Sequence, residues 1–233
     1  MDIATPISEA GRLLFDPESG LWEIVALSLL VSASAVALGA LIGLPLGYAL
    51  GTGRSRATRG MHGLVNTGMS LPPVVAGLFV FMLLSRSGPL GELGMLYSRP
   101  AMVLAQFVIA TPLVAGVTAA AIASVPLDLR LQARSLGANR LQEAWLTVRE
   151  ARRGVAAAII AGFGAVISEV GAVMLVGGNI EGSTRVMTTA IVLETRQGRF
   201  GTAIALGLIL VGIAMLVNGL LTVVQHSGVR YER

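Results

Sequence analysis

Four long stretches of this chain contain no charged residue, and they constrain its fold more than any other feature. They lie between Glu23 and Arg54, Arg59 and Arg86, Arg99 and Asp128, and Arg199 and Arg230. Each exceeds the roughly 20 residues that a helix needs to cross about 30 Å of hydrocarbon. A fifth apolar block, Gly154 to Ile180, is interrupted only by Glu169. The pattern predicts five transmembrane helices, and a content of 54% hydrophobic residues places the chain outside the range of soluble domains.

The arginines predict how the chain crosses the membrane. All 17 basic residues are arginine, and cytoplasmic loops of membrane proteins carry the excess of positive charge. Eleven of them fall on the side that holds residues 125–154 and the C-terminus, and six fall on the other side. We therefore expect an external N-terminus and a cytoplasmic C-terminus. The positive charge reflects this orientation, and no nucleic-acid partner is expected.

The spans divide the chain into three parts. Residues 1–22 are expected to form an external lead with a short amphipathic helix, residues 23–225 the transmembrane domain, and residues 226–233 a cytoplasmic tail. The acidic start and the long first apolar block indicate that the first span is retained and is not a cleaved signal peptide. A second short amphipathic helix is expected in the external loop near residues 186–193, where apolar residues recur at helical spacing.

Glycine and proline mark the predicted spans. The first, near 23–51, carries glycines at four-residue spacing (Gly39, Gly43, Gly47), which lets a neighbouring helix approach closely, and Pro45 is expected to bend it. Prolines in LPPVVAG (71–77) and ATPLVAG (110–116) are expected to disrupt the second and third spans, near 63–85 and 100–124. The prolines have two interpretations. They can allow helices to rearrange around a transport path, or they can be kinks that only serve packing. The fourth and fifth spans are expected near 155–178 and 200–225.

The charged stretch at residues 125–154 predicts a helical hairpin. Pro126 suits a first helical turn, Gly137 can end that helix in a left-handed conformation, and Asn139 with Gln142 forms a capping-box pattern for a second helix. The second helix has an apolar stripe (Leu141, Ala144, Trp145, Val148), and its other face holds residues expected to be solvated or paired (Arg140, Glu143, Arg149, Glu150). Such a hairpin could dock into a groove on another protein or pack against its own bundle.

Two segments resemble the permease subunits of ATP-binding-cassette importers: the stretch ARSLGANRLQEAW and the continuation AGFGAVISEVGAVMLVGGNIEGSTRVMTTAIVLETRQGRF. The place of the first segment before the last two spans also resembles these permeases. Among these, the chain is most similar to permeases of the tungstate type, which are related to the molybdate and sulfate permeases. The resemblance covers about residues 28–225. It implies the all-α fold of type I importers in a prokaryotic inner membrane. It also implies a homodimer that forms the path, two cytoplasmic ATPase subunits that each grip one hairpin, and an external binding protein.

The family's cytoplasmic signature is Glu-Ala-Ala, three residues, Gly, then nine residues to Ile-x-Leu-Pro. Aligned on Gly137, only Ala133 and that glycine match, while the ending VREARRG looks like the tungstate-type variant. The resemblance implies that the hairpin contacts the ATPase through Ala133, Leu136, Gly137, Ala138, Asn139, Leu141 and Trp145.

The sequence offers few residues that could hydrolyse a nucleotide, catalyse a reaction or bind a metal. A phosphate-binding P-loop requires a lysine and this sequence has none, so we expect ATP to be hydrolysed by a separate subunit. Cysteine is absent, and His62 in a cytoplasmic loop and His226 near the end of the fifth span have no spacing that suggests a metal site. We expect a transporter subunit without catalytic residues, metal or cofactor, and a membrane enzyme is a weak alternative.

Glu169 is the ionisable residue that lies well inside a span, where charge is costly. Because a carboxylate would repel a doubly negative oxyanion, we expect Glu169 to be protonated, or paired with Ser168 or an arginine, and to hold the geometry of a gate. Direct contact with the anion is the alternative.

Hydroxyls and amide N–H groups bind a tetrahedral oxyanion without a permanent opposite charge. Near the predicted outer mouth the candidates are Gly177, Gly178, Asn179, Ser183, Thr184, Thr188 and Thr189. The resemblance implies a gate on residues 168–179, whereas the hydroxyl run could also be an external loop that only meets the binding protein.

These features together predict the membrane-spanning subunit of an ATP-driven oxyanion importer that works by alternating access, with tungstate as the substrate. A molybdate or sulfate importer is the alternative within this class. A membrane scaffold without an ATPase partner is the alternative outside it.

Overall fold

The computed structural model describes residues 4–17, 19–53 and 55–226, and within them the chain is helical without any β-strand. The elements in chain order are α1 (Ala4–Phe15), α2 (Leu21–Thr52), α3 (Arg56–Ser70), α4 (Pro73–Leu84), the 3-10 turn η1 (Gly91–Leu93), α5 (Arg99–Ala123), α6 (Leu127–Ser135), α7 (Arg140–Glu150), α8 (Arg152–Ile167), α9 (Gly171–Gly177), α10 (Met187–Arg196) and α11 (Phe200–His226). The expected all-α fold is confirmed.

Three helices are long and apolar enough to cross a membrane alone, namely α2, α5 and α11. Two further crossings each consist of two helices. α3 and α4 are bent by 100° at their junction, and α8 and α9 are bent by 62°. Five crossings result if each bent pair is one span, so the spans expected near 63–85 and 155–178 are broken helices.

Local chemistry explains both breaks. Pro72 and Pro73 follow α3 and lack the backbone N–H groups that would continue its hydrogen bonds, so a new helix begins there. No proline stands between α8 and α9. Instead, the Glu169 carboxylate accepts a hydrogen bond from the N–H of Ala172 at 2.9 Å, which satisfies a donor in the first turn of α9.

Two sequence predictions are wrong in this region. α5 continues unbroken through Pro112, where a disruption was expected, because a membrane helix surrounded by other helices tolerates the lost hydrogen bond. α3 begins at Arg56 with Ser55 as its cap, so His62 lies on a helix and not in a loop. The His62 ring contacts the carbonyl oxygen of Leu50 at 3.2 Å.

A glycine stripe brings α2 against α5 at the centre of the fold. A Cβ atom at Gly47 would lie 2.6 Å from the carbonyl oxygen of Ala115, and one at Gly51 would lie 2.6 Å from that of Ala119. Only glycine allows backbones to approach so closely. The close packing predicted from the four-residue spacing is confirmed, and the stripe extends to Gly51.

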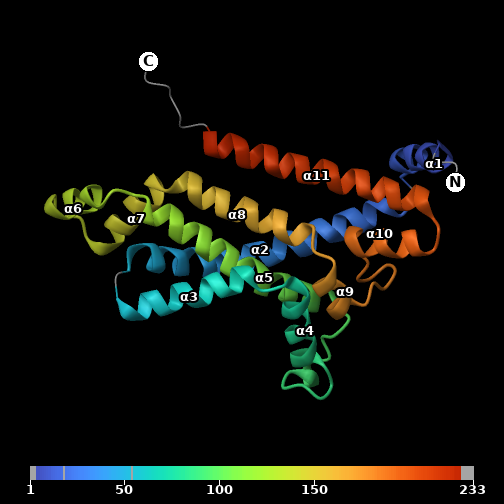
Figure 1. Cartoon of the computed structure of the whole chain (residues 1–233), viewed down its shortest axis with the longest axis horizontal. Coiled ribbons are helices and arrows are strands. Elements are labelled where there is room, and N and C mark those ends of the chain that lie inside the picture. Colours follow the sequence, from blue (N-terminus) through green and yellow to red (C-terminus); the bar gives the residue numbers. More distant parts are fainter. Residues whose placement is uncertain (1–3, 18, 54, 227–233) are drawn as a thin grey trace.

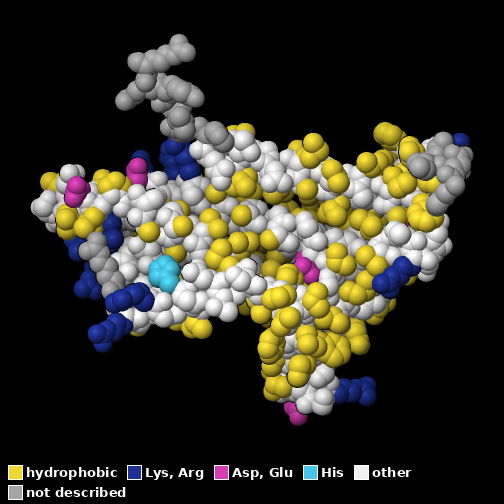
Figure 2. All heavy atoms as spheres, in the orientation of Figure 1, with side chains coloured by type: hydrophobic (Ala, Val, Ile, Leu, Met, Phe, Trp, Pro, Cys, Tyr) yellow, Lys and Arg dark blue, Asp and Glu magenta, His cyan; other side chains and the backbone are white. Residues whose placement is uncertain are grey.

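Figure 1 shows α2, α5, α8 and α11 running along the long axis of the molecule, with α6 and α7 at one end and α1 and α10 at the other. α1 and α10 are the two short helices expected outside the spans, and both pack against α11. α4 projects from the side of the bundle, and hydrophobic side chains cover it (Figure 2). Arginine side chains gather at the end that carries α6 and α7.

Candidate functional site

The turn between α6 and α7 has the conformation that the sequence predicts. Gly137 adopts φ +86°, a left-handed conformation that favours glycine, and the N–H of Ala138 donates to the carbonyl of Ala133 at 3.0 Å. The next helix starts with a complete capping box. The N–H of Gln142 donates to Oδ1 of Asn139 at 2.9 Å, and the N–H of Asn139 donates to Oε1 of Gln142 at 2.8 Å.

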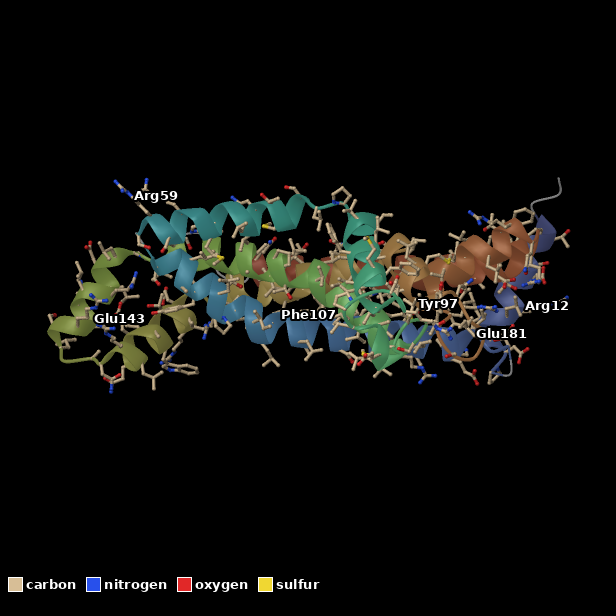
Figure 3. The ribbon with its side chains drawn as sticks, turned by 90° about the horizontal axis from the view of Figure 1, so that it is seen from below. Arg12, Arg59, Tyr97, Phe107, Glu143 and Glu181 are labelled. Carbon is tan, nitrogen blue, oxygen red and sulfur yellow. The ribbon has the colours of Figure 1, made fainter. Side chains whose placement is uncertain are left out.

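Glu143 joins the two helices of the hairpin from within. Its side chain is buried, with 3% of the residue exposed, and it accepts hydrogen bonds from Nε of Arg130 at 2.9 Å and from Nε and a terminal nitrogen of Arg134 at 2.6 and 3.0 Å. Hydrogen bonds from Arg134 lower the pKa of Glu143; burial opposes this and Arg130 adds to it. The same contact raises the pKa of Arg134. We call these three residues the hairpin clamp; Figure 3 labels Glu143 in it.

The hairpin therefore holds Glu143 inward, whereas its charged residues Arg140, Arg149 and Glu150 are exposed together with part of its apolar stripe. Leu136, Leu141 and Trp145 are 88%, 80% and 70% exposed. Beside them are two shallow hollows of about 460 and 560 Å³, the first around Ala133, Leu136, Gly137 and Ala138 and the second around Leu141, Ala144, Trp145 and Val148. Exposed apolar patches of this kind mark interaction sites. Leu141 and Trp145 do not pack against the described bundle, whereas Val148 of the same stripe packs against Ile122, Val125 and Ala151. Docking of the stripe onto another protein stays a prediction.

The second candidate region is the break between α8 and α9. Besides its bond to Ala172, Glu169 accepts a hydrogen bond at its carbonyl oxygen from the hydroxyl of Thr188 on α10, at 2.8 Å. Ser168, proposed as a partner of the carboxylate, instead donates its hydroxyl to the carbonyl of Gly164 at 3.0 Å. Glu169 is thus paired, as expected, but with a backbone N–H group.

α9 packs directly on α4, so the two broken helices meet. A Cβ atom at Gly77 would lie 2.4 Å from the Cα atom of Ala172, and one at Gly171 would lie 2.3 Å from the side chain of Val74. This spacing leaves no room for larger side chains. The two helices are therefore in direct backbone contact at these glycines.

Several of the polar residues predicted near the outer mouth bind other parts of the same loop. Thr184 is buried and its hydroxyl donates to the carbonyl of Gly177 at 2.5 Å while accepting the N–H of Ile180 at 2.9 Å. Thr189 is also buried and its hydroxyl bonds to the backbone of Val186. These hydroxyls hold the loop together.

The neighbouring residues of the predicted gate pack in the same compact loop. Gly177 faces Met102, and Gly178 adopts φ +70° beside the ring of Tyr97. Asn179 adopts φ +53°, and its side-chain nitrogen reaches the carbonyl of Thr189 at 3.5 Å. The assignment of these residues to a gate stays a prediction.

Residues 43–227 match the family described as the binding-protein-dependent transport system inner membrane component. The chain belongs to this family. A probable anion ABC transporter permease protein of Haloferax volcanii is 45% identical over 203 residues, which cover 85% of this chain and 88% of that protein. The tungstate uptake system permease protein TupB of Peptoclostridium acidaminophilum is 38% identical over 213 residues, which cover 91% and 92% of the two chains.

Solved structures of transporters share the fold of this permease. The MetNI methionine ABC transporter, in inward-facing conformations, matches with a TM-score of 0.69 at 19% identity, covering 88% of this chain and 94% of the other. An amino acid ABC transporter crystallised with histidines matches with a TM-score of 0.65 at 17% identity, covering 96% and 97%. The chain is a multi-pass membrane permease with the fold of type I importers.

The hairpin clamp of this permease was not predicted, although the sequence contains a signal for it. Arg130 and Arg134 are four residues apart on α6 and therefore share one face. A carboxylate on the facing helix was the natural partner for that pair. Within the described residues, no group of three or more His, Asp and Glu side chains could hold a metal ion.

Proposed function

We propose that this chain is the membrane-spanning subunit of an ATP-driven importer that carries tungstate into the cytoplasm by alternating access. The observation that carries the proposal is the exposed apolar stripe of α7 in a permease whose relatives include tungstate permeases at 38% and 37% identity. Relatives named as sulfate and molybdenum permeases share only 25% and 29% identity, which makes those anions the second choice.

The proposed partners follow from the exposed apolar side chains of the chain and from its lack of a P-loop lysine. ATP hydrolysis requires a P-loop lysine, so two cytoplasmic ATPase subunits would supply it, each gripping one hairpin through Leu141 and Trp145. An external binding protein would deliver the anion. A second copy of the chain would cover α4, whose side chains Val74, Leu78 and Phe79 are exposed on the projecting helix.

The orientation and division of the chain are part of the same proposal. The N-terminus and residues 1–22 would lie outside, residues 23–225 would form the membrane domain with the hairpin at 125–154 in the cytoplasm, and residues 226–233 would form a cytoplasmic tail. The arginine distribution and the position of the hairpin support this arrangement.

The fold offers a rigid route from the hairpin to the break in the membrane. The clamp fixes α7 to α6, and α7 passes into α8 at Ala151 without a loop, since the same residue ends one helix and begins the next. α8 leads to Glu169, α9 and, through the contact at Gly77, α4. When the ATPase subunits close, this series of helices would carry the movement to residues 168–179.

Co-purification with the ATPase subunit tests the proposal. We expect Trp145→Asp to abolish co-purification and to reduce ATP-dependent tungstate uptake to less than about a tenth, because exposed aromatic anchors contribute about 2 kcal/mol or more to binding. Ser135→Asp is the matched control, because it adds the same charge to an exposed site of the hairpin outside the apolar stripe. Uptake by membrane vesicles with the binding protein present, compared for tungstate, molybdate and sulfate, identifies the substrate. Normal assembly without any ATPase partner would favour a scaffold.

A further inference from the structure

One strip along the outward side of α3 is polar at a depth where lipid would surround a membrane helix, although the neighbouring Leu64 is apolar and 67% exposed. At 3.6 residues per turn, Arg56, Arg59, Gly63, Asn66, Thr67 and Ser70 fall on one side of this helix, and all six are exposed. We call them the α3 stripe. Figure 3 shows Arg59 pointing away from the rest of the molecule. The opposite side packs against α5, where Val65 is buried.

Contacts with α5 fix the depth of the stripe. A Cβ atom at Gly68 would lie 2.8 Å from the Cβ atom of Pro112, and the sulfur of Met69 lies against Gly116. Pro112 is near the middle of α5, a helix long enough to span the membrane. Asn66, Thr67 and Ser70 therefore lie close to the middle of the bilayer, while Arg56 and Arg59 lie toward the hairpin end.

Hydrocarbon is a poor environment for this face. Thr67 and Ser70 satisfy their hydroxyl hydrogens with the carbonyls of Gly63 and Asn66, at 2.9 and 3.0 Å. The side-chain amide of Asn66 has no hydrogen-bond partner within the described part of the chain. Placing an unpaired amide in an apolar medium costs several kcal/mol, so this side of α3 must meet water or polar groups.

The electrostatics of the stripe suit an anion. α3 contains no acidic residue, and its only charged side chains are arginines in the first turns. The Glu169 carboxylate is bonded to Ala172 and does not lie on this helix. A Cβ atom at Gly63 would meet no atom within 4 Å, so the stripe is open along its length. The neutral N–H donors of the Asn66 amide can hold an oxyanion briefly, and the arginines can draw it toward the cytoplasm.

We propose that the α3 stripe forms a wall of the aqueous path, and that the side-chain amide of Asn66 binds the oxyanion in transit, one turn from Ser70. This inference rests on the proposed function, since it names where the transported anion makes contact within the membrane. It assigns the contact to α3, outside the region at residues 168–179.

The absence of cysteine from the chain allows a clean test, because every introduced thiol is the only one in the permease. Ser70→Cys and Thr67→Cys would be treated with a negatively charged, membrane-impermeant methanethiosulfonate in vesicles that contain the assembled transporter. Leu64→Cys is the control, since Leu64 is 67% exposed on the same helix but lies beside the stripe. We expect the stripe thiols to react at least about tenfold faster, because a thiol in apolar surroundings stays protonated and inert. Tungstate, but not chloride, should slow the reaction at Ser70→Cys.

Equal reaction rates at the three positions, or no protection by tungstate, would overturn the inference. Oxidative cross-linking of Ser70→Cys between two copies, with no reaction in the vesicles, would assign the stripe to a dimer interface instead.

A second measurement covers variants that assemble poorly. Asn66→Leu should raise the tungstate concentration for half-maximal uptake several-fold, Asn66→Gln should raise it less, and Leu64→Ala should leave it unchanged. If the unmodified permease with its partners transports no tungstate, the proposed function fails, whereas a failure confined to the α3 variants leaves it standing.

Discussion

The hairpin and the break between α8 and α9 each depend on one carboxylate, but the two are held in different ways. Glu143 lies between two guanidinium groups from a neighbouring helix, whereas Glu169 binds a single backbone N–H group three residues along the chain. The hairpin lies at the end of the molecule, where water can solvate the outer atoms of Arg134, which is 57% exposed. An ionic clamp is tolerable there, because the buried Glu143 carboxylate accepts hydrogen bonds from both guanidinium groups while Arg134 keeps its contact with water.

The two carboxylates therefore have different roles. At Glu143 the negative charge itself matters, because two cations would otherwise face each other across the hairpin. At Glu169 only an acceptor oxygen is needed, so the site can work without a cation close to an anion path. The same substitution at the two positions should therefore have unequal effects.

The largest effect is expected from Glu143→Gln. The change leaves Arg130 and Arg134 without a counter-charge and should weaken the closed hairpin by about 2 kcal/mol, discounted for the exposure of Arg134. Trypsin should then cleave the hairpin more than about tenfold faster, because cleavage follows the population of the open form. Tungstate uptake should fall in parallel. Unchanged cleavage would mean that the clamp does not hold the hairpin.

A smaller effect is expected from Glu169→Leu. Leucine fills the space but leaves the N–H of Ala172 without its acceptor, which costs about 1 kcal/mol when the donor is shielded from water. Thermal unfolding of the purified permease in detergent should occur at a lower temperature, and uptake should fall several-fold while the hairpin keeps its resistance to trypsin. Loss of that resistance would show that the two regions are not independent.

The hairpin and the break between α8 and α9 were not equally predictable from the sequence. The hairpin depends on local signals, and Gly137, Asn139 and Gln142 act within one turn of their own positions, so its helices were predictable. The burial of Glu143 and the exposure of Leu141 and Trp145 were not predictable, because an apolar stripe normally faces inward. The arginines that pair with Glu143 lie on another helix. The orientation is set by tertiary pairing.

The spans show the same contrast. Gaps in the charge pattern predict five crossings because the bilayer sets their length. The breaks were harder to predict. Pro72 and Pro73 indicate one, but the bend of α8 depends on a side chain that caps α9, and Pro112, with the same local signal, leaves α5 continuous. The polar face of α3 went unnoticed because its first residues were taken for a loop.

A weak dependence on pH is expected for the hairpin. The pKa of Glu143 is lower in the folded protein than in the unfolded chain, so its stabilising contribution is present above the unfolded value and is lost as the pH falls through the folded value. The fluorescence of Trp145, measured in a Trp22→Phe background, should stay constant from neutral pH to about pH 5 and change only in stronger acid. Glu143→Gln should remove the acid transition. A transition near neutral pH would contradict the assignment.

The smallest effect is expected from Glu169→Gln, and it is the sharpest test of the contrast between the regions. Glutamine keeps an acceptor oxygen at the same distance along the side chain, so the hydrogen bond from Ala172 and the start of α9 should persist. Uptake should remain at half or more of the unmodified rate, while Glu143→Gln, which makes the same chemical change, should reduce it far more. Because both variants replace one carboxylate with one amide, any general effect of the substitution on expression or folding is matched between them. Complete loss of uptake by Glu169→Gln with normal assembly would mean that the charge of Glu169 takes part in gating, and that the hairpin and the membrane break use their carboxylates in the same way.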